Sequence, residues 1–411
     1  MKNSNNKCSL RIALFVSIYP LGTSSVLLNL ITMLCNTNKY IDLYTEPESL
    51  KVPFIPNDGV RLFIEPHRLH FFYRVCLKIK LFLLELFKKR SLAIQISQIS
   101  HRYVKTAEWV AISLQKKPAY DIAIYATYPS LFISSFLHVK PKISIYYNLE
   151  FIDDSMGITA DVDFRFVRQI ERSHFRYIDW FFATSPKRAQ IFHDQTQIPS
   201  DKIRVLPVLP LMSKIPISNK YFHKKFNLSE SINIILITGS IGERLLQKEI
   251  INTVHTWPEN TALVFHSWVD GIFDSGYGLS LKEESKDLPV YFSTEALCYN
   301  EMLASIASVS VGLAFYDDID TNYREIFFSS NKIIEFLRCG IPVISSENKE
   351  LNDFFMKYKC GFSISIENIP EALENILNNY ETYRQAAFNV FHKNYSFEYF
   401  FNNAFDGILN L

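Results

Sequence analysis

Residues 329–345 read Ser329-Ser-Asn-Lys-Ile-Ile-Glu-Phe-Leu-Arg-Cys-Gly-Ile-Pro-Val-Ile-Ser345. A serine N-cap begins a short helix at Asn331, and isoleucine and leucine at helical spacing give that helix one apolar face. Gly340 stops the helix, and Pro342 opens a strand. The helix N-terminus can face a phosphate, and Glu335, one turn further on, can accept hydrogen bonds from vicinal sugar hydroxyls such as those of a ribose. The stretch therefore predicts a helix–strand unit that binds a phosphorylated, hydroxyl-rich ligand.

The same alternation of strands and amphipathic helices continues outward from this stretch over the 411 residues. Several strands are apolar throughout, as strands buried on both faces of a parallel sheet must be. A stretch with three prolines, 206–218, interrupts the alternation once, and it then restarts. We therefore predict an α/β protein with two Rossmann-like domains that face each other across a cleft. The expected strands are Ile12–Ser17, Ile41–Tyr44, Val60–Ile64, Asp121–Tyr125, Ile143–Tyr147, Trp180–Ala183 and Ile203–Leu206, then Ile232–Thr238, Ala262–His266, Val290–Ser293, Val309–Phe315 and Pro342–Ser345.

The length fits two or three domains of roughly 100–200 residues each. We place an N-terminal domain at 1–210 and a C-terminal domain at 211–395. A terminal helix at 396–411 can cross back to the first domain. Hydrophobic residues make up 48% of the chain and charged residues 21%, which excludes a disordered protein.

Composition also excludes several classes of site. The six cysteines form no Cys-x-x-Cys pair, which argues against a disulfide framework or a zinc site and fits a reducing cytoplasm. Glycine is scarce, with 12 residues, and neither G-x-G-x-x-G nor a P-loop motif occurs, which argues against nicotinamide, flavin or P-loop chemistry. No uncharged apolar run reaches about 18 residues, so we predict no transmembrane span.

The stretch 329–345 resembles the donor-binding motif of GT-B glycosyltransferases, most like the large retaining group-1 family, in which it runs roughly P-N-K-x-x-E-Y-x-A-x-G-x-P-V-I. Ser330 stands where that family often has proline. The resemblance implies that Glu335 binds the donor ribose. Many members have a second glutamate eight residues earlier, where this chain has Phe327. A glutamate soon after a lysine on a short helix is also typical of a solvated surface pair. The matching positions are Asn331, Lys332, Glu335, Gly340, Pro342, Val343 and Ile344.

Weaker resemblances extend the expected donor site through the second domain. The strand and turn 236–242 look like the family's phosphate-facing glycine loop, followed by basic residues that neutralise the diphosphate. A solvated helix start explains the basic residues equally well, and a lone histidine at a strand end is more often structural. The donor-side candidates are Gly239, Ser240, Arg244, Lys248, His266, Ser330, Asn331, Lys332 and Glu335.

In the first domain, the loop 19–24 is similar to a loop that approaches donor phosphates or the acceptor, with Gly22 and Thr23 as candidates. The strand end 146–150 resembles one that faces the cleft. Glu150 is therefore the candidate to orient the acceptor or to act as a base, with a buried ion pair as the alternative. Glu171, by contrast, we interpret as structural.

One acidic motif suggests a metal site. Asp318-Ile-Asp320 looks like the metal-binding D-x-D of the GT-A fold, but it follows a strand of the second domain. The resemblance to GT-B enzymes, in which a helix end and basic side chains take the place of a metal ion, implies no metal and no cofactor beyond the sugar nucleotide.

Residues 61–105 carry ten basic side chains against two acidic ones, interleaved with large apolar residues. Such a helix can lie on an anionic membrane surface, or it can pack its apolar face on the core. Nucleic acid is a poor partner because no binding motif accompanies the charge.

Taken together, these patterns predict a cytoplasmic enzyme, peripheral to the inner face of the plasma membrane if 61–105 docks there. It would move a sugar, with retention, from a nucleoside-diphosphate-sugar to a glycan or lipid-linked acceptor in bacterial surface polysaccharide synthesis. A sugar-nucleotide epimerase shares this architecture. Because Phe327 replaces the second glutamate, a catalytically inactive binding or scaffold subunit is a further alternative.

Overall fold

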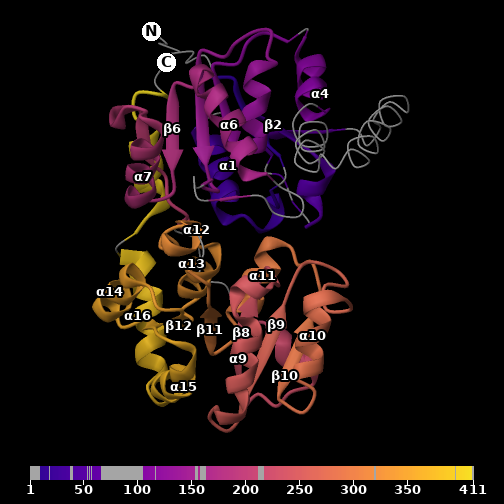
Figure 1. Ribbon diagram of the computed structural model, residues 1–411, viewed down its shortest axis with the longest axis vertical. Coiled ribbons are helices and arrows are strands. Elements are labelled where there is room, and N and C mark those ends of the chain that lie inside the picture. The colour runs from indigo at the N-terminus through magenta and orange to yellow at the C-terminus, as the bar shows by residue number, and fades with distance from the viewer. Residues whose placement is uncertain are drawn as a thin grey trace, which may run out of the picture. The chain divides into compact units, whose positions relative to one another are not determined.

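A computed structural model describes residues 10–17, 19–37, 40–52, 54, 56, 58–65, 105–115, 117–152, 156–157, 163–211, 217–318, 321–393 and 395–409 (Figure 1). The chain divides into two compact units. The first runs to Pro207 and takes in the last residues from Phe400 onward. The second runs from Val208 to Tyr399 and includes the short piece Val52–Phe54.

The first unit is built on a seven-stranded parallel sheet in the order β3-β2-β1-β4-β5-β6-β7. Its first strand is buried along its whole length, which explains the unbroken apolar sequence there. The strands are β1 (Ile12–Val16), β2 (Ile41–Thr45), β3 (Val60–Ile64), β4 (Ile122–Ala126), β5 (Ile143–Asn148), β6 (Trp180–Ala183) and β7 (Ile203–Val205); the helices are α1 (Ser25–Thr37), α4 (Lys105–Leu114), α5 (Tyr128–Leu131), α6 (Phe164–His174) and α7 (Pro186–Thr196).

The second unit is built on a six-stranded parallel sheet in the order β10-β9-β8-β11-β12-β13. The strands are β8 (Asn233–Thr238), β9 (Thr261–His266), β10 (Val290–Ser293), β11 (Val311–Ala314), β12 (Val343–Ser345) and β13 (Gly361–Ser363). The helices are α8 (Tyr221–Phe226), α9 (Gln247–Thr253), α10 (Gly276–Glu284), α11 (Tyr299–Ile306), α12 (Thr321–Arg324), α13 (Asn331–Arg338), α14 (Lys349–Tyr358), α15 (Ile369–Asn378) and α16 (Tyr380–Lys393).

The predicted class, two parallel α/β sheets, is confirmed, and every predicted strand lies within two residues of an observed one. The short strand β13 was not predicted, because its three residues begin with glycine and form no apolar run. In both units the strand order reverses beside the first strand, between β1 and β4 and between β8 and β11. Ligands of open α/β sheets bind at the carboxyl ends of the strands at this reversal.

The last helix, α17 (Phe397–Ala404), begins in the second unit and ends in the first. The Nη1 atom of Arg204, in β7, donates hydrogen bonds to the carbonyls of Ala404 and Asp406, each at 2.7 Å. The same guanidinium stacks on the ring of Trp180 at 3.8 Å. These contacts fix the C-terminal residues against the edge of the first sheet.

Helix α13 is held against the second sheet by one close contact. Phe336 is fully buried, and its ring lies on the backbone of Gly312 in β11. A Cβ atom at Gly312 would overlap that ring. Only glycine therefore allows α13 to approach the sheet this closely.

We expect Gly312→Ala to destabilise the protein by about 1–3 kcal/mol, because the added methyl group overpacks the contact with Phe336. Chemical denaturation would measure the loss. Gly157→Ala is the control, since no described atom lies within 4 Å of the point where its Cβ atom would stand. Combining Gly312→Ala with Phe336→Leu should recover part of the loss. An unchanged midpoint for Gly312→Ala would contradict the contact.

Candidate functional site

The candidate site lies in the second unit, where the strand order reverses between β8 and β11. The loop after β8 begins at Gly239, whose φ of 98° is a conformation that glycine adopts freely and other residues rarely. The Gly239 N–H donates to the carbonyl of His266 at 2.9 Å. Further along this loop, the carbonyl of Arg244 accepts from the N–H of Asp317, which follows β11, at 2.9 Å. The two chain segments that flank the reversal are thus joined directly.

The N-terminus of α13 is fixed beside these segments by Ser330. Its hydroxyl caps the helix by accepting from the Ile333 N–H at 3.2 Å, as the sequence predicted. The same hydroxyl lies 2.8 Å from the hydroxyl of Tyr316, which follows β11. The first turn of α13 therefore has a defined position relative to the strand reversal.

Lys332, in that first turn, brings a positive charge to the glycine loop. Its Cε atom would lie 4.0 Å from a Cβ atom at Gly239, and its ammonium lies 5.3 Å from the centre of the Tyr316 ring. Within the described part of the chain, no carboxylate lies at ion-pair distance from this ammonium. Burial lowers the pKa of Lys332 to about 8. An unpaired, largely enclosed ammonium beside a glycine turn is a strong feature for binding an anion.

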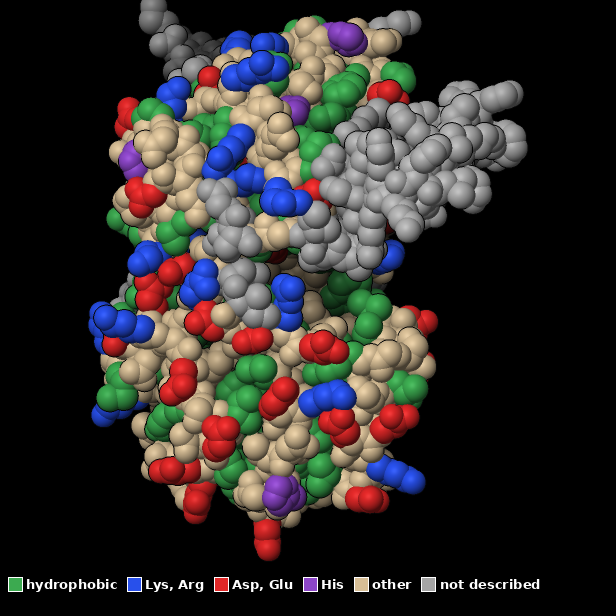
Figure 2. All heavy atoms as spheres, in the orientation of Figure 1, with side chains coloured by type: hydrophobic (Ala, Val, Ile, Leu, Met, Phe, Trp, Pro, Cys, Tyr) green, Lys and Arg blue, Asp and Glu red, His purple; other side chains and the backbone are tan. Residues whose placement is uncertain are grey.

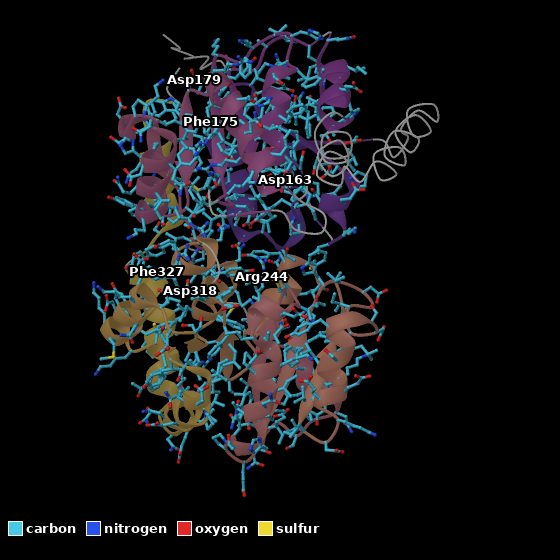
Figure 3. All side chains as sticks on the ribbon, in the orientation of Figure 1. Asp163, Phe175, Asp179, Arg244, Asp318 and Phe327 are labelled. Atoms are coloured by element: carbon cyan, nitrogen blue, oxygen red, sulfur yellow. The ribbon has the colours of Figure 1, made fainter. Side chains whose placement is uncertain are left out.

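The other two predicted cations are placed differently. Lys248, on α9, forms an ion pair with Glu284 of α10 at 2.6 Å. Arg244 is exposed and follows the acidic Glu243 in sequence; Figure 3 shows it at the same end of the second unit as Asp318 and Phe327. Acidic side chains are scattered over the face of this unit drawn in Figure 2. Of the three predicted cations, Lys332 is thus the one that lies beside the glycine loop without an ion-pair partner in the described chain.

Glu335 is buried and does not form the solvated surface pair that its spacing from Lys332 would also allow. Its side chain is 2% exposed, and one carboxylate oxygen accepts from the hydroxyl of Tyr299, in α11, at 2.6 Å. The other oxygen lies 3.5 Å from Nη1 of Arg338, which donates to the same tyrosine hydroxyl at 2.9 Å. The alternative of a solvated pair is wrong because the carboxylate packs against Tyr299 of another helix and Arg338 of its own. Its role toward a ribose stays a prediction.

His266 ends β9 within the site. Its Nδ1 atom lies 3.0 Å from the hydroxyl of Ser293, and the ring of Phe222 packs against it at 5.6 Å. Burial lowers the pKa of His266 to about 4, so the imidazole is neutral at pH 7. The histidine therefore contributes a hydrogen-bonding ring, and a carbonyl that holds Gly239, rather than a charge.

Phe327 occupies the position where the related motif often has a second glutamate. Its ring stacks on Phe328 at 4.1 Å and packs against Phe354 at 4.7 Å. Tyr395 extends the same aromatic cluster. A carboxylate here would lie against aromatic rings, so the surroundings of this position suit phenylalanine.

In the first unit, the predicted residues lie after β1 and β5. Gly22 is buried in a short 3-10 turn, and the hydroxyl of Thr23 lies 3.4 Å from the carbonyl of Pro20. Glu150 is exposed beyond the end of β5. Thr127, which the sequence did not single out, follows β4 with φ 72° and ψ 159°, a region almost reserved for glycine. Its hydroxyl donates to the carbonyl of Ser17 across the strand reversal at 3.1 Å.

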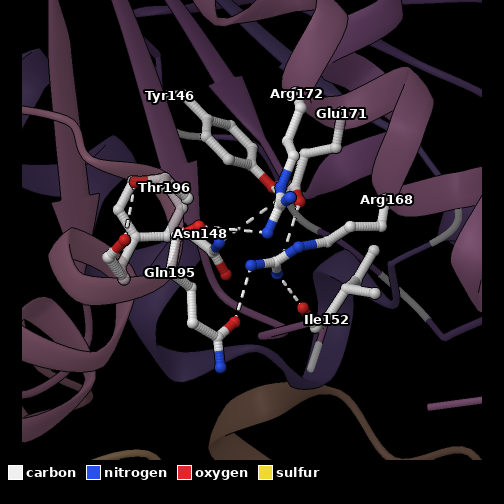
Figure 4. Close-up of polar contacts among 9 residues, drawn as sticks. Tyr146, Asn148, Ile152, Arg168, Glu171, Arg172, Gln195 and Thr196 are labelled. Carbon is white, nitrogen blue, oxygen red and sulfur yellow. Dashed lines mark hydrogen bonds and ion pairs between the residues drawn. The ribbon is translucent and has the colours of Figure 1, made fainter. Parts of the chain in front are cut away.

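Glu171 belongs to a buried polar network between β5 and α6 (Figure 4). It accepts from the hydroxyl of Tyr146 at 2.7 Å and from the amide of Asn148 at 3.4 Å. Arg168 lies 3.9 Å away and donates to the Gln195 side chain at 2.6 Å. The dense mutual contacts are those of a structural cluster.

Two sequence predictions fall partly outside the described residues. Asp320 of the D-x-D motif lies outside them, as does the basic stretch 61–105 from residue 66 to residue 104. Among the described residues, no three His, Cys, Asp or Glu side chains gather as metal ligands would. No described helix has the length and apolarity needed to cross a membrane.

No family model and no curated protein matches the sequence. Solved structures do match over almost the whole chain. WaaG, a glycosyltransferase involved in lipopolysaccharide biosynthesis, has a TM-score of 0.63 at 15% identity, covering 96% of this chain and 98% of WaaG. Anabaena HepE, in complex with UDP and glucose, has a TM-score of 0.65 at 11% identity, covering 98% and 100%. The chain has the GT-B fold.

A third GT-B-like structure is a Listeria monocytogenes protein assigned as a UDP-N-acetylglucosamine 2-epimerase, with a TM-score of 0.52 at 12% identity, covering 92% of this chain and 91% of that one. At such low identity these likenesses establish the GT-B architecture alone.

We expect Lys332→Met to stabilise the protein by on the order of 1 kcal/mol at pH 7, because it removes an unpaired, partly buried charge. The folded-state pKa of about 8 lies below the ordinary value of 10.5. In wild type, the charged Lys332 therefore lowers the free energy of unfolding by its full amount below pH 8. This destabilisation disappears progressively between about pH 8 and 10.5. The stability gap between variant and wild type should shrink over that window. Denaturation as a function of pH measures it.

The control is Lys248→Met, which removes a surface ion pair and should change stability by less than about 0.5 kcal/mol with no such pH dependence. If Lys332→Met were less stable than wild type at pH 7, the unpaired charge would be disproved.

We expect Glu335→Ala to cost about 3 kcal/mol, because it leaves Arg338 buried without its counter-ion and Tyr299 without its acceptor. Adding Arg338→Met should reduce the combined loss below the sum of the single losses. Glu381→Ala is the matched control: Glu381 pairs with Arg384 at the same helical spacing but is exposed, so its loss should stay under about 0.5 kcal/mol. Equal losses for the two glutamates would contradict the buried triad.

Proposed function

We propose that this GT-B protein is a glycosyltransferase that binds a nucleoside-diphosphate-sugar where β8 and β11 meet and transfers the sugar to an acceptor. The observation that carries the proposal is the unpaired ammonium of Lys332 beside the Gly239 turn. Nothing in the described chain neutralises this charge, so a diphosphate gains a charge-assisted contact there without displacing a protein carboxylate. The complex of HepE with UDP and glucose, a protein of the same fold, is in line with such a donor.

The proposed chemistry needs stabilisation of the leaving group. When the bond between the anomeric carbon and the diphosphate oxygen breaks, negative charge accumulates on the nucleoside diphosphate. The position of Lys332 beside the Gly239 turn, and the N-terminal turn of α13 capped by Ser330, support a role in stabilising that charge. We propose that they supply the electrostatic role without a bound metal ion.

Finer assignments extend the same proposal. In the retaining course that we favour, an oxygen of the departing diphosphate takes the proton of the acceptor hydroxyl as the new bond forms on the same face. In an inverting course Glu150, exposed after β5, is the candidate base. We further propose a hexose donor and a glycan or lipid-linked acceptor of bacterial surface polysaccharide, in line with the role of WaaG in lipopolysaccharide biosynthesis. The enzyme would act in the cytoplasm, with 61–105 against the inner membrane surface.

A sugar-nucleotide epimerase is the second candidate, because a protein assigned to that activity shares the architecture. The two activities differ in what they consume. An epimerase converts its sugar nucleotide without any acceptor, whereas a transferase releases nucleoside diphosphate in proportion to acceptor glycosylated.

We expect one of UDP, GDP, ADP and TDP to bind the wild-type protein in calorimetric titration and to raise its melting temperature. Lys332→Met should weaken this binding at least about tenfold at pH 7, since each tenfold corresponds to about 1.4 kcal/mol of lost charge-assisted contact. In wild type the affinity should fall as pH rises above about 8, where the unliganded lysine loses its proton.

Lys248→Met, whose lysine already pairs with Glu284, should bind nearly as wild type does. If none of the four nucleotides binds, the glycosyltransferase proposal is wrong, and the inactive scaffold subunit is the remaining alternative. Conversion of a sugar nucleotide in the absence of acceptor would instead establish the epimerase.

A further inference from the structure

We propose that Gln247 is a positioning residue that holds the loop 239–242 in the shape that binds the donor diphosphate. This inference rests on the proposed function of the same site. Gln247 is the first residue of α9, and its side chain is completely buried although it carries a polar amide. A buried amide needs partners for both its oxygen and its nitrogen.

The partners of Gln247 are the two ends of one short turn. Its Oε1 atom accepts from the N–H of Gly242 at 3.0 Å, and its Nε2 atom donates to the carbonyl of Ser240 at 3.2 Å. The backbone partners fix the orientation of the amide, because an N–H can only donate and a carbonyl can only accept. One side chain therefore braces the turn at two points.

Gly242 is also held through its carbonyl, which accepts from the Leu245 N–H at 3.0 Å, and two further backbone bonds act outside this turn. Gly239 is tied to His266, and Arg244 is tied to Asp317. Over the described residues, no acceptor takes the N–H groups of Ser240 and Ile241. Backbone N–H groups in a glycine turn form anion-binding concavities, and Lys332 lies against the same turn. Gln247 thus leaves these two donors available while it fixes the backbone that carries them.

Glutamine suits this position because it both donates and accepts. Glutamate has the same shape, but it accepts only, so the contact to the Ser240 carbonyl becomes repulsive and a negative charge is placed near the diphosphate. Methionine fills a similar volume and makes neither hydrogen bond. Leu246, immediately before Gln247, adopts φ 52°, an uncommon conformation for leucine, at the turn that leads into α9. The chain thus accepts local strain at the position from which Gln247 braces the loop.

The test compares ligands with and without phosphates. For the nucleoside diphosphate that wild type binds, we measure affinity by calorimetry, and for the corresponding free nucleoside by NMR titration. We expect Gln247→Glu to weaken diphosphate binding at least about tenfold and Gln247→Met to weaken it less, about threefold to tenfold. Nucleoside affinity should stay within about twofold of wild type in both variants, which also shows that they are folded. Gln190→Glu, the same change at an exposed glutamine of α7, should alter neither.

The proposal is overturned if Gln247→Glu binds the nucleoside diphosphate as tightly as wild type. It is also overturned if diphosphate and nucleoside affinity fall together, or if neither variant folds, because Gln247 would then be a core residue without a phosphate-specific role. If wild type binds no nucleotide, the proposed function itself is wrong. If wild type binds a nucleoside diphosphate and both variants bind it equally well, only the role of Gln247 is wrong.

Discussion

The ring of Phe336 lying on the bare backbone of Gly312 is the contact from which the geometry of the second unit follows. It sets how closely α13 approaches β11, and so where the first turn of that helix stands. Ser330 and Tyr316 then fix the end of the helix. Lys332 lies beside the glycine turn because the contact between Phe336 and Gly312, about one helical turn away, fixes the helix. The position of the charge is thus decided in the hydrophobic core, where a shift of one methylene is felt.

The opposite charges of Lys332 and Glu335, both in α13, do not pair with each other. Glu335 follows Lys332 on the same helix but turns inward, where it accepts from the Tyr299 hydroxyl and forms an ion pair with Arg338. Lys332 turns to the loop and remains without a carboxylate partner in the described chain. The helix therefore separates a buried ion pair from a cation that has no carboxylate partner in the described chain. An internal Lys332–Glu335 pair would have stabilised the fold and removed the attraction for an anion.

Most of the fold was predictable because its determinants are local in sequence. Apolar runs marked the strands, and Ser330 and Gly340 marked the ends of α13. The side-chain contacts were less predictable because they join distant segments. Tyr299 lies 36 residues from Glu335, and Glu284 lies 36 residues from Lys248. Gln247 gave no signal at all, since a glutamine at a helix start is ordinarily solvated; only the loop that folds over it reveals its partners.

The hydrogen bonds from Arg204 to the C-terminal residues determine the order in which the two units can fold while the chain is synthesised. The edge of the first sheet is completed by residues that follow the entire second unit, which makes the second unit an insertion between β7 and the C-terminal residues. On the ribosome, the second unit can therefore close while the first still lacks its final contacts. A fragment ending near Pro207 would lack Phe405, whose ring packs edge-on against Phe182 of β6, and the two carbonyls that Arg204 binds. The first unit can be isolated intact only by splicing its two pieces together.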